Sequence, residues 1–170
     1  MKNFSNIVAF QGVWFASVLG AAHGYPWIGA VALLPFLLWQ LGSSSDPGYD
    51  LRALLVMGAA GLAIDSIYPI LGSLSYSSPW PSSGFAPAWL VVMWLNLALT
   101  MNHSLRWLRR RYLLAALFGS TGGALSYWAG ARLGAMQLHW PTSTIIPLIG
   151  LIWAVALPAT YRALERPERT

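Results

Sequence analysis

The sequence contains no cysteine, and only 9% of its 170 residues are charged. The absence of cysteine excludes disulfide bonds, thiolate chemistry and cysteine-ligated metals. The scarcity of charge excludes an ordinary soluble domain, which carries roughly 25% charged residues. With 56% hydrophobic residues and a mean hydropathy of +0.55, the chain could not maintain a surface that dissolves in water. The composition therefore predicts an integral membrane protein.

Apolar stretches recur from Ile7 to Tyr161, and several approach the ~20 residues that a helix needs to cross ~30 Å of hydrocarbon. Polar segments and Gly- or Pro-containing segments separate them. The sequence thus predicts an all-α fold, a polytopic transmembrane helical bundle in which residues 1–170 form a single integral membrane domain. The six expected spans are about 7–22, 27–41, 51–70, 88–101, 112–129 and 144–161.

Details of four segments follow from the same pattern. A cleavable secretory signal is the alternative for the first span, but Gln11 and Trp14 interrupt its apolar run, so we expect the helix to be retained. Asp50 is expected to cap the third helix. The fourth helix either ends near residue 101 or continues to Leu108. Residues 71–87 are too polar to span and are expected to lie on the outer interface.

Basic residues set the direction of the spans, because cationic side chains stay on the cytoplasmic side of a bacterial-type membrane. Six spans with a cytoplasmic N-terminus place nine of the ten Lys and Arg residues inside and only Arg132 outside. The nine are Lys2, Arg52, Arg106, Arg109, Arg110, Arg111, Arg162, Arg166 and Arg169. This pattern predicts a multi-pass protein of the bacterial inner (cytoplasmic) membrane, N-in/C-in. The formal net charge is +5, and the basic residues lie at helix ends. The expected partners are therefore anionic membrane lipids and not nucleic acid.

Asp65 is the sharpest candidate residue. A charged carboxylate at a helix centre costs about 2.5 to 3.5 kcal/mol on insertion scales, so it must face protein or water, find a partner or stay protonated. It lies nearer the outer end of its span, within expected reach of Arg132 and His23. Gly58 and Gly61 share its helical face, where another helix can approach closely. Two interpretations remain open: a functional carboxyl, or one that only pairs with Arg132 or caps a neighbouring backbone.

The fifth span carries Gly119-x-x-x-Gly123 and Gly130-x-x-x-Gly134, spacings that favour close helix packing. Tyr127 lies between them at a depth comparable with Asp65, and its hydroxyl needs a partner if buried. The catalytic candidates are therefore Asp65, Tyr127 and His23, although no role is assigned to any of them.

A polar stripe marks the fourth span, since Asn96, Thr100, His103 and Trp107 follow one another on one side of a helix. One interpretation is hydrogen bonding between helices, worth roughly 0.6 kcal/mol per contact. The other is a cytoplasmic pocket in which His103 is a base or ligand, a neighbouring side chain orients the substrate and the arginines bind phosphate. The candidates for lipid or substrate binding are Asp65, Asn102, His103, Ser104, Arg132, Arg109, Arg110 and Arg111.

We expect neither a metal nor a cofactor. His23, Asp65 and His139 could converge on the outer face, but their spacing matches no ligand motif. Phosphate-binding loops, dinucleotide fingerprints and nucleophile elbows are also absent from the sequence.

Six stretches carry a family resemblance. They are Gln11-Gly12-Val13-Trp14-Phe15 with Gly20-Ala21-Ala22, Gly61-Leu62-Ala63-Ile64-Asp65-Ser66, Ala86-Pro87-Ala88-Trp89, Thr100-Met101-Asn102-His103-Ser104-Leu105-Arg106-Trp107-Leu108 and Gly130-Ala131-Arg132-Leu133-Gly134-Ala135. On these residues nearly the whole chain resembles a bacterial inner-membrane family, domain of unknown function 2878 (DUF2878). The resemblance implies location and topology but no activity. The genes of family members look like neighbours of genes for fatty-acyl modification. It points to Asp65, Asn102, Ser104, Tyr127 and Arg132 as positions to test.

Three hypotheses of function follow. The first is a membrane protein that binds or positions lipid, or supports a lipid-modifying enzyme, with that enzyme or a second copy of the chain as a further partner. The second is a small intramembrane enzyme on an acyl or phospholipid substrate. The third is a proton-coupled small transporter in which Asp65 titrates, although the chain shows no inverted repeat.

Overall fold

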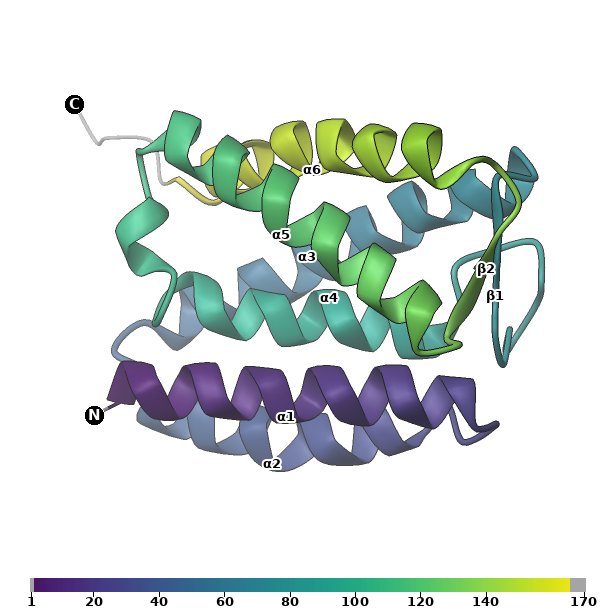
Figure 1. Ribbon diagram of the computed structural model, residues 1–170. Coiled ribbons are helices and arrows are strands. Elements are labelled where there is room, and N and C mark those ends of the chain that lie inside the picture. Colours follow the sequence, from purple (N-terminus) through teal and green to yellow (C-terminus); the bar gives the residue numbers. More distant parts are fainter. Residues whose placement is uncertain (1, 166–170) are drawn as a thin grey trace.

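The computed structural model describes residues 2–165, which form six helices, a short 3₁₀ helix and a two-stranded sheet (Figure 1). In chain order the elements are α1 (Lys2–Ala22), α2 (Ile28–Ser43), α3 (Pro47–Ile70), β1 (Leu74–Tyr76), α4 (Ala88–Met101), the 3₁₀ helix η1 (Arg106–Leu108), α5 (Tyr112–Arg132), β2 (Met136–Leu138) and α6 (Thr142–Leu164). The predicted helical fold is confirmed, and each helix lies within a few residues of an expected span. The sheet was not expected from the sequence.

The lengths of the helices bear on membrane crossing. Within residues 2–165, three helices are long and apolar enough to cross a membrane, namely α1, α3 and α6. The helices α2 and α4 are apolar but shorter. Large apolar side chains on the outside of the bundle are exposed, among them Leu55 and Leu113, each 75% exposed. A surface of this kind is suited to contact with lipid tails.

The helices pack in three pairs with α4 near the middle (Figure 1). The helices α1 and α2 pair, α3 pairs with α4, and α5 pairs with α6. The α1/α2 pair contacts α4, whereas α6 contacts α3. The main core therefore forms where α3, α4, α5 and α6 meet, around Met57, Trp94, Tyr127 and Trp153.

Both described ends of the chain lie at the same end of the bundle, because successive helices run in opposite directions (Figure 1). The start of α1, the start of α3, η1 and the end of α6 meet there, and these segments carry the basic residues. The residues at this end are Lys2, Arg52, Arg106, Arg109, Arg110, Arg111 and Arg162. Arg132 ends α5 at the opposite end of the bundle. Arg166 and Arg169 lie outside the described residues.

The start of α3 corrects one prediction. Asp46, rather than Asp50, is the N-cap residue, because Asp46 Oδ1 accepts a hydrogen bond from the Tyr49 backbone N–H at 3.0 Å. Pro47 occupies the first turn, where its missing N–H costs no hydrogen bond. This leaves the Asp50 carboxyl free to turn inward, and it is fully buried.

Glycines decide how closely the helices approach. A side chain at Gly61 would clash with the Trp94 ring, so the predicted close approach on this face of α3 is confirmed, and α4 provides the neighbouring helix. A Cβ at Gly119 would lie 2.5 Å from the Trp153 carbonyl oxygen, so α5 meets α6 through its small residues. The prediction is wrong for the second glycine pair, because Gly134 lies in the turn after α5 with a φ of +88°.

Residues 71–87 are anchored at one part and exposed at another. Strand β1 pairs antiparallel with β2, with Ser75 opposite Gln137, whereas residues 79–85 are exposed. The Ser73 carbonyl also accepts from the backbone N–H groups of His139, at 2.9 Å, and Trp140, at 3.1 Å. Further on, the Ser77 carbonyl accepts from Trp89 Nε1 of α4 at 3.0 Å. These bonds tie the α3–α4 and α5–α6 connections into one structure at the end of the bundle away from the basic residues.

Candidate functional site

Asp65 is fully buried and is bonded by three elements. Its Oδ2 accepts a hydrogen bond from Trp94 Nε1 of α4 at 2.6 Å, and its Oδ1 accepts one from the Tyr127 hydroxyl of α5. Its backbone carbonyl accepts from the Tyr76 hydroxyl of β1 at 2.9 Å. Burial raises the pKa of Tyr76 above its ordinary value, so this hydroxyl stays a neutral donor.

The prediction that Asp65 lies within reach of Arg132 and His23 is wrong. The Arg132 guanidinium lies over the Trp128 ring, 5.5 Å from its centroid. His23 is exposed, and its Nδ1 lies 2.8 Å from the Leu19 carbonyl of its own helix. Tyr127, in contrast, lies at the depth of Asp65, as predicted. The carboxyl is therefore held by two neutral donors rather than by a cation.

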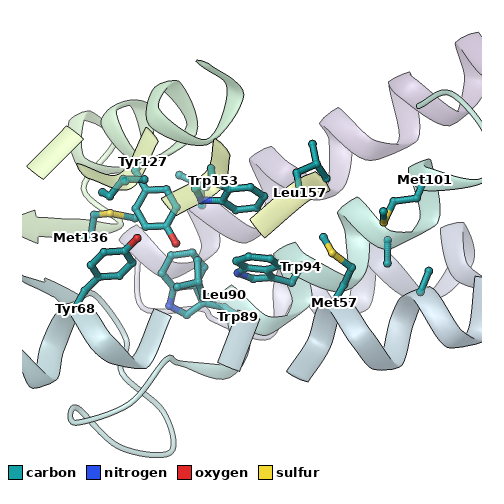
Figure 2. Close-up of a cluster of buried hydrophobic side chains, with 14 of the residues drawn as sticks. Met57, Tyr68, Trp89, Leu90, Trp94, Met101, Tyr127, Met136, Trp153 and Leu157 are labelled. Atoms are coloured by element: carbon teal, nitrogen blue, oxygen red, sulfur yellow. The ribbon is translucent and has the colours of Figure 1, made fainter. Parts of the chain in front are cut away.

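The local sequence explains why Trp94 reaches this carboxyl. The absence of a side chain at Gly61 lets the Trp94 ring lie against α3, one helical turn from Asp65. On its other side, Trp94 stacks on Trp153 of α6, with ring centroids 4.4 Å apart and planes 17° apart. Figure 2 shows Trp94, Trp153 and Tyr127 gathered in one buried cluster.

A cavity of about 440 Å³ adjoins this cluster. Side chains of α1, α4 and α5 form most of its wall, and Trp153 and Leu157 of α6 and Met136 of β2 complete it. The wall is largely apolar. Among its few polar groups, Trp14 Nε1 of α1 donates to Ser126 Oγ of α5 at 2.9 Å. This bond joins α1 and α5 across the cavity, while each helix packs mainly on other neighbours.

Asp65 stands behind the wall of this cavity. Trp94 and Tyr127 line it, and both donate to the carboxyl of Asp65, which is not itself a lining residue. Asp65 is therefore placed to hold the orientation of two lining side chains rather than to touch a bound molecule.

The continuous helical stripe expected around the predicted pocket at residues 102–111 is not formed. The helix α4 ends at Met101, so the continuation to Leu108 is not formed, and the polar stripe ends before His103. His103 Nε2 instead lies 3.2 Å from Asp50 Oδ2. Asn102 Oδ1 accepts from Arg109 Nη2 at 2.8 Å.

The other residues predicted for this pocket make different contacts. Ser104 Oγ donates to Asn6 Oδ1 at 2.5 Å, and Asn6 Nδ2 in turn donates to Gln40 Oε1 at 2.7 Å. The Arg109 guanidinium lies 3.7 Å from the centroid of the Tyr49 ring, whereas Arg110 and Arg111 are exposed. Asn102 and His103 thus both lie beside Asp50, and Arg109 contacts Asn102. Ser104 belongs to a separate network with Asn6 and Gln40, so the predicted members of the pocket are only partly brought together.

The Trp94 and Trp153 positions were missed as site residues. Both lie in the middle of an apolar run, away from the interfacial positions where tryptophan is usual in membrane proteins. A buried indole N–H also needs an acceptor. A tryptophan at mid-span was therefore the signal that could have identified them.

The residues weighed for a metal do not converge. His139 Nε2 lies 3.0 Å from Ser75 Oγ, His23 is bonded to its own helix, and Asp65 is enclosed by Trp94 and Tyr127. Within residues 2–165, no group of three His, Asp or Glu side chains could hold a metal ion.

Comparison with known proteins found one family. A family model described as "Protein of unknown function (DUF2878)" matches residues 3–159. No curated protein and no solved structure matched the chain.

Proposed function

The chain belongs to DUF2878, a family of proteins of unknown function, and we propose that it is a bacterial inner-membrane protein that binds the acyl chain of a lipid between α1 and α5. The observation that carries the proposal is the apolar cavity of about 440 Å³ bounded by α1, α4 and α5. Ligand sites commonly have volumes of about 300–1,000 Å³, apolar walls and a few placed polar groups. This cavity has all three properties.

The membrane arrangement in this proposal has six crossings with both termini in the cytoplasm. It is supported by the alternating direction of the helices and by the collection of basic residues at the end where α1 begins and α6 ends. In that arrangement the cavity lies within the hydrocarbon layer, where an acyl chain can enter sideways between α1 and α5. Membrane lipids are then the partners of the protein, with a lipid-modifying enzyme as a further candidate.

Photolabelling tests the proposal. Purified protein in mild detergent is mixed with a phospholipid that carries a photoreactive diazirine on its acyl chain, and the labelled peptides are mapped. We expect labels on cavity residues of α1 and α5, for example near Phe10, Val18 and Ser126.

A matched pair of variants sharpens this experiment. Gly122 lines the cavity and has open space around its Cβ position, so Gly122→Phe should fill the cavity and reduce labelling at least several-fold. Gly12 also has open space but is not a lining residue, so Gly12→Phe should label like the wild type. Labels spread evenly over all outward faces, unaffected by Gly122→Phe, would refute a cavity site.

A second candidate, an enzyme acting on the bound lipid, is favoured by one contact. Tyr127 lines the cavity and its hydroxyl is hydrogen-bonded to Asp65, and a phenol paired with a carboxyl can serve in proton transfer. Membrane lipids of a deletion strain complemented with wild type, Asp65→Asn or Tyr127→Phe would be compared by mass spectrometry. A lipid species that both variants fail to restore supports the enzyme, and full restoration by both supports binding alone.

A further inference from the structure

Trp153 carries a polar atom with no partner. Within residues 2–165 its Nε1 finds no hydrogen-bond acceptor, although the side chain is only 8% exposed. The other tryptophans that line the cavity each have an acceptor. These acceptors are Ser126 Oγ for Trp14, the Ser77 carbonyl for Trp89 and Asp65 Oδ2 for Trp94. Trp153 thus differs from its neighbours in the one property that a bound molecule could satisfy.

Trp153 is itself a lining residue of the cavity, and it lies against the glycines of α5. A Cβ at Gly123 would lie 2.5 Å from Trp153 Cδ1, the ring carbon bonded to Nε1, and Gly123 itself lines the cavity. Figure 2 shows the indole nitrogen on the edge of the ring nearer to Tyr127. The glycines of α5 therefore leave an opening through which Trp153 of α6 reaches the cavity wall.

A bilayer gives this donor particular importance. Lipid tails are as apolar as leucine, so transfer of an acyl chain from the membrane into an apolar cavity gains little hydrophobic free energy. Packing and hydrogen bonds must then provide the selectivity. An N–H group surrounded by apolar atoms would discriminate strongly between ligands that carry an acceptor and ligands that do not.

We propose that Trp153 Nε1 donates a hydrogen bond to a carbonyl oxygen of the occupant, so that the cavity selects acyl esters over plain hydrocarbon chains. This inference rests on the proposed lipid-binding function and names the chemical class of its ligand. The carbonyl would lie beside Tyr127, with the chain running along the apolar wall between α1 and α5. Asp65 is a positioning residue in this scheme, since it holds Trp94, on which Trp153 stacks.

Competition for the photoreactive probe tests the proposal on the full chain. Methyl palmitate and hexadecane have similar chains, but only the ester carries a carbonyl. We expect methyl palmitate to displace the probe from wild-type protein at a concentration about five- to tenfold lower than hexadecane does, the value of one neutral hydrogen bond. Trp153→Phe should abolish this difference by weakening the ester alone.

The matched control is Trp128→Phe on α5. Trp128 is exposed and is not a lining residue, so its loss should leave both ligands unchanged. Equal displacement by the two ligands in the wild type would overturn the ester preference but leave the cavity as a lipid site. Weaker displacement by both ligands in Trp153→Phe would assign the ring a packing role only. Displacement by neither ligand would refute the proposed function itself.

A measurement on the wild type covers the case in which Trp153→Phe fails to fold. Methyl palmitate labelled with carbon-13 at its carbonyl has an infrared band that moves to lower wavenumber when the oxygen accepts a hydrogen bond. We expect that shift for the bound ester relative to the ester in hexadecane. An unshifted band would overturn the proposal.

Discussion

Asp65 shows how a carboxyl can be kept inside an apolar bundle without a cation. Both of its oxygens accept hydrogen bonds, from the indole of Trp94 and the phenol of Tyr127, and these donors come from two other helices. The same carboxyl therefore links α3 to α4 and α5. Its loss would leave two buried donors without a partner.

We expect Asp65→Ala to lower the free energy of unfolding by about 2 to 6 kcal/mol, since each stranded donor costs about 1 to 3 kcal/mol. Asp65→Asn keeps one accepting oxygen and should cost less. Thermal or denaturant unfolding in detergent measures both. The control is Asp46→Ala, which removes the helix cap and should cost about 1 kcal/mol. A loss in Asp65→Ala no larger than that of the control would show that the network is not structural.

Among individual residues, His103 is also expected to stabilise the fold rather than to act as a base. Its Nε2 lies 3.2 Å from the fully buried Asp50 carboxyl, so His103→Ala should lower the unfolding free energy by about 1 to 3 kcal/mol. His139→Ala is the control, because His139 is bonded to Ser75 near the surface and its removal should have a smaller effect. Equal effects in the same unfolding assay would contradict this view.

At the scale of elements, contacts between α5 and α6 depend on which glycine faces the neighbouring helix. Gly123 lies against the Trp153 ring, whereas Gly122, the adjacent residue, has open space. We expect Gly123→Ala to destabilise the protein by about 1 to 3 kcal/mol through overpacking. Gly122→Ala should stabilise it by up to about 1 kcal/mol, because alanine favours the helix. Unfolding curves that give the two variants the same sign would contradict this packing.

The pairing of β1 with β2 predicts a pattern of hydrogen exchange. Backbone amides of residues 74–76 and 136–138 that donate across the sheet should exchange more slowly than those of residues 81–85, where the only amide bond described is from Gly84 to Ser82 Oγ. Exchange followed by mass spectrometry in detergent would measure this difference. Equal rates in the two regions would show that the strands open freely in solution.

At the scale of the whole molecule, the absence of cysteine makes topology easy to test. Ser45 lies between α2 and α3, Ser83 lies between β1 and α4, and both are exposed. In intact cells we expect a membrane-impermeant maleimide to label Ser83→Cys from the periplasm and to leave Ser45→Cys unlabelled until the membrane is opened. Labelling of both from outside would contradict the proposed six crossings.

Much of the fold was predictable because membrane helices are dictated by local composition. An apolar run must satisfy its own backbone hydrogen bonds in lipid, so it forms a helix whatever it packs against. The start of α5 at Tyr112 was predicted for this reason, whereas the end of α4 at Met101 was one of two alternatives that the sequence left open. Asp65 could also be singled out, since a carboxyl within an apolar run requires a partner.

The identity of that partner was decided by the tertiary structure. Arg132 was the expected choice on charge, but Gly61 lets Trp94 come closer and α5 brings Tyr127 to the same level. Residues far apart in the sequence also pair as β1 and β2, with strands too short to show an alternating pattern. The cavity was likewise decided by the tertiary structure, because an empty space between α1 and α5 depends on how several helices pack together. Such a space leaves no local signal along the chain.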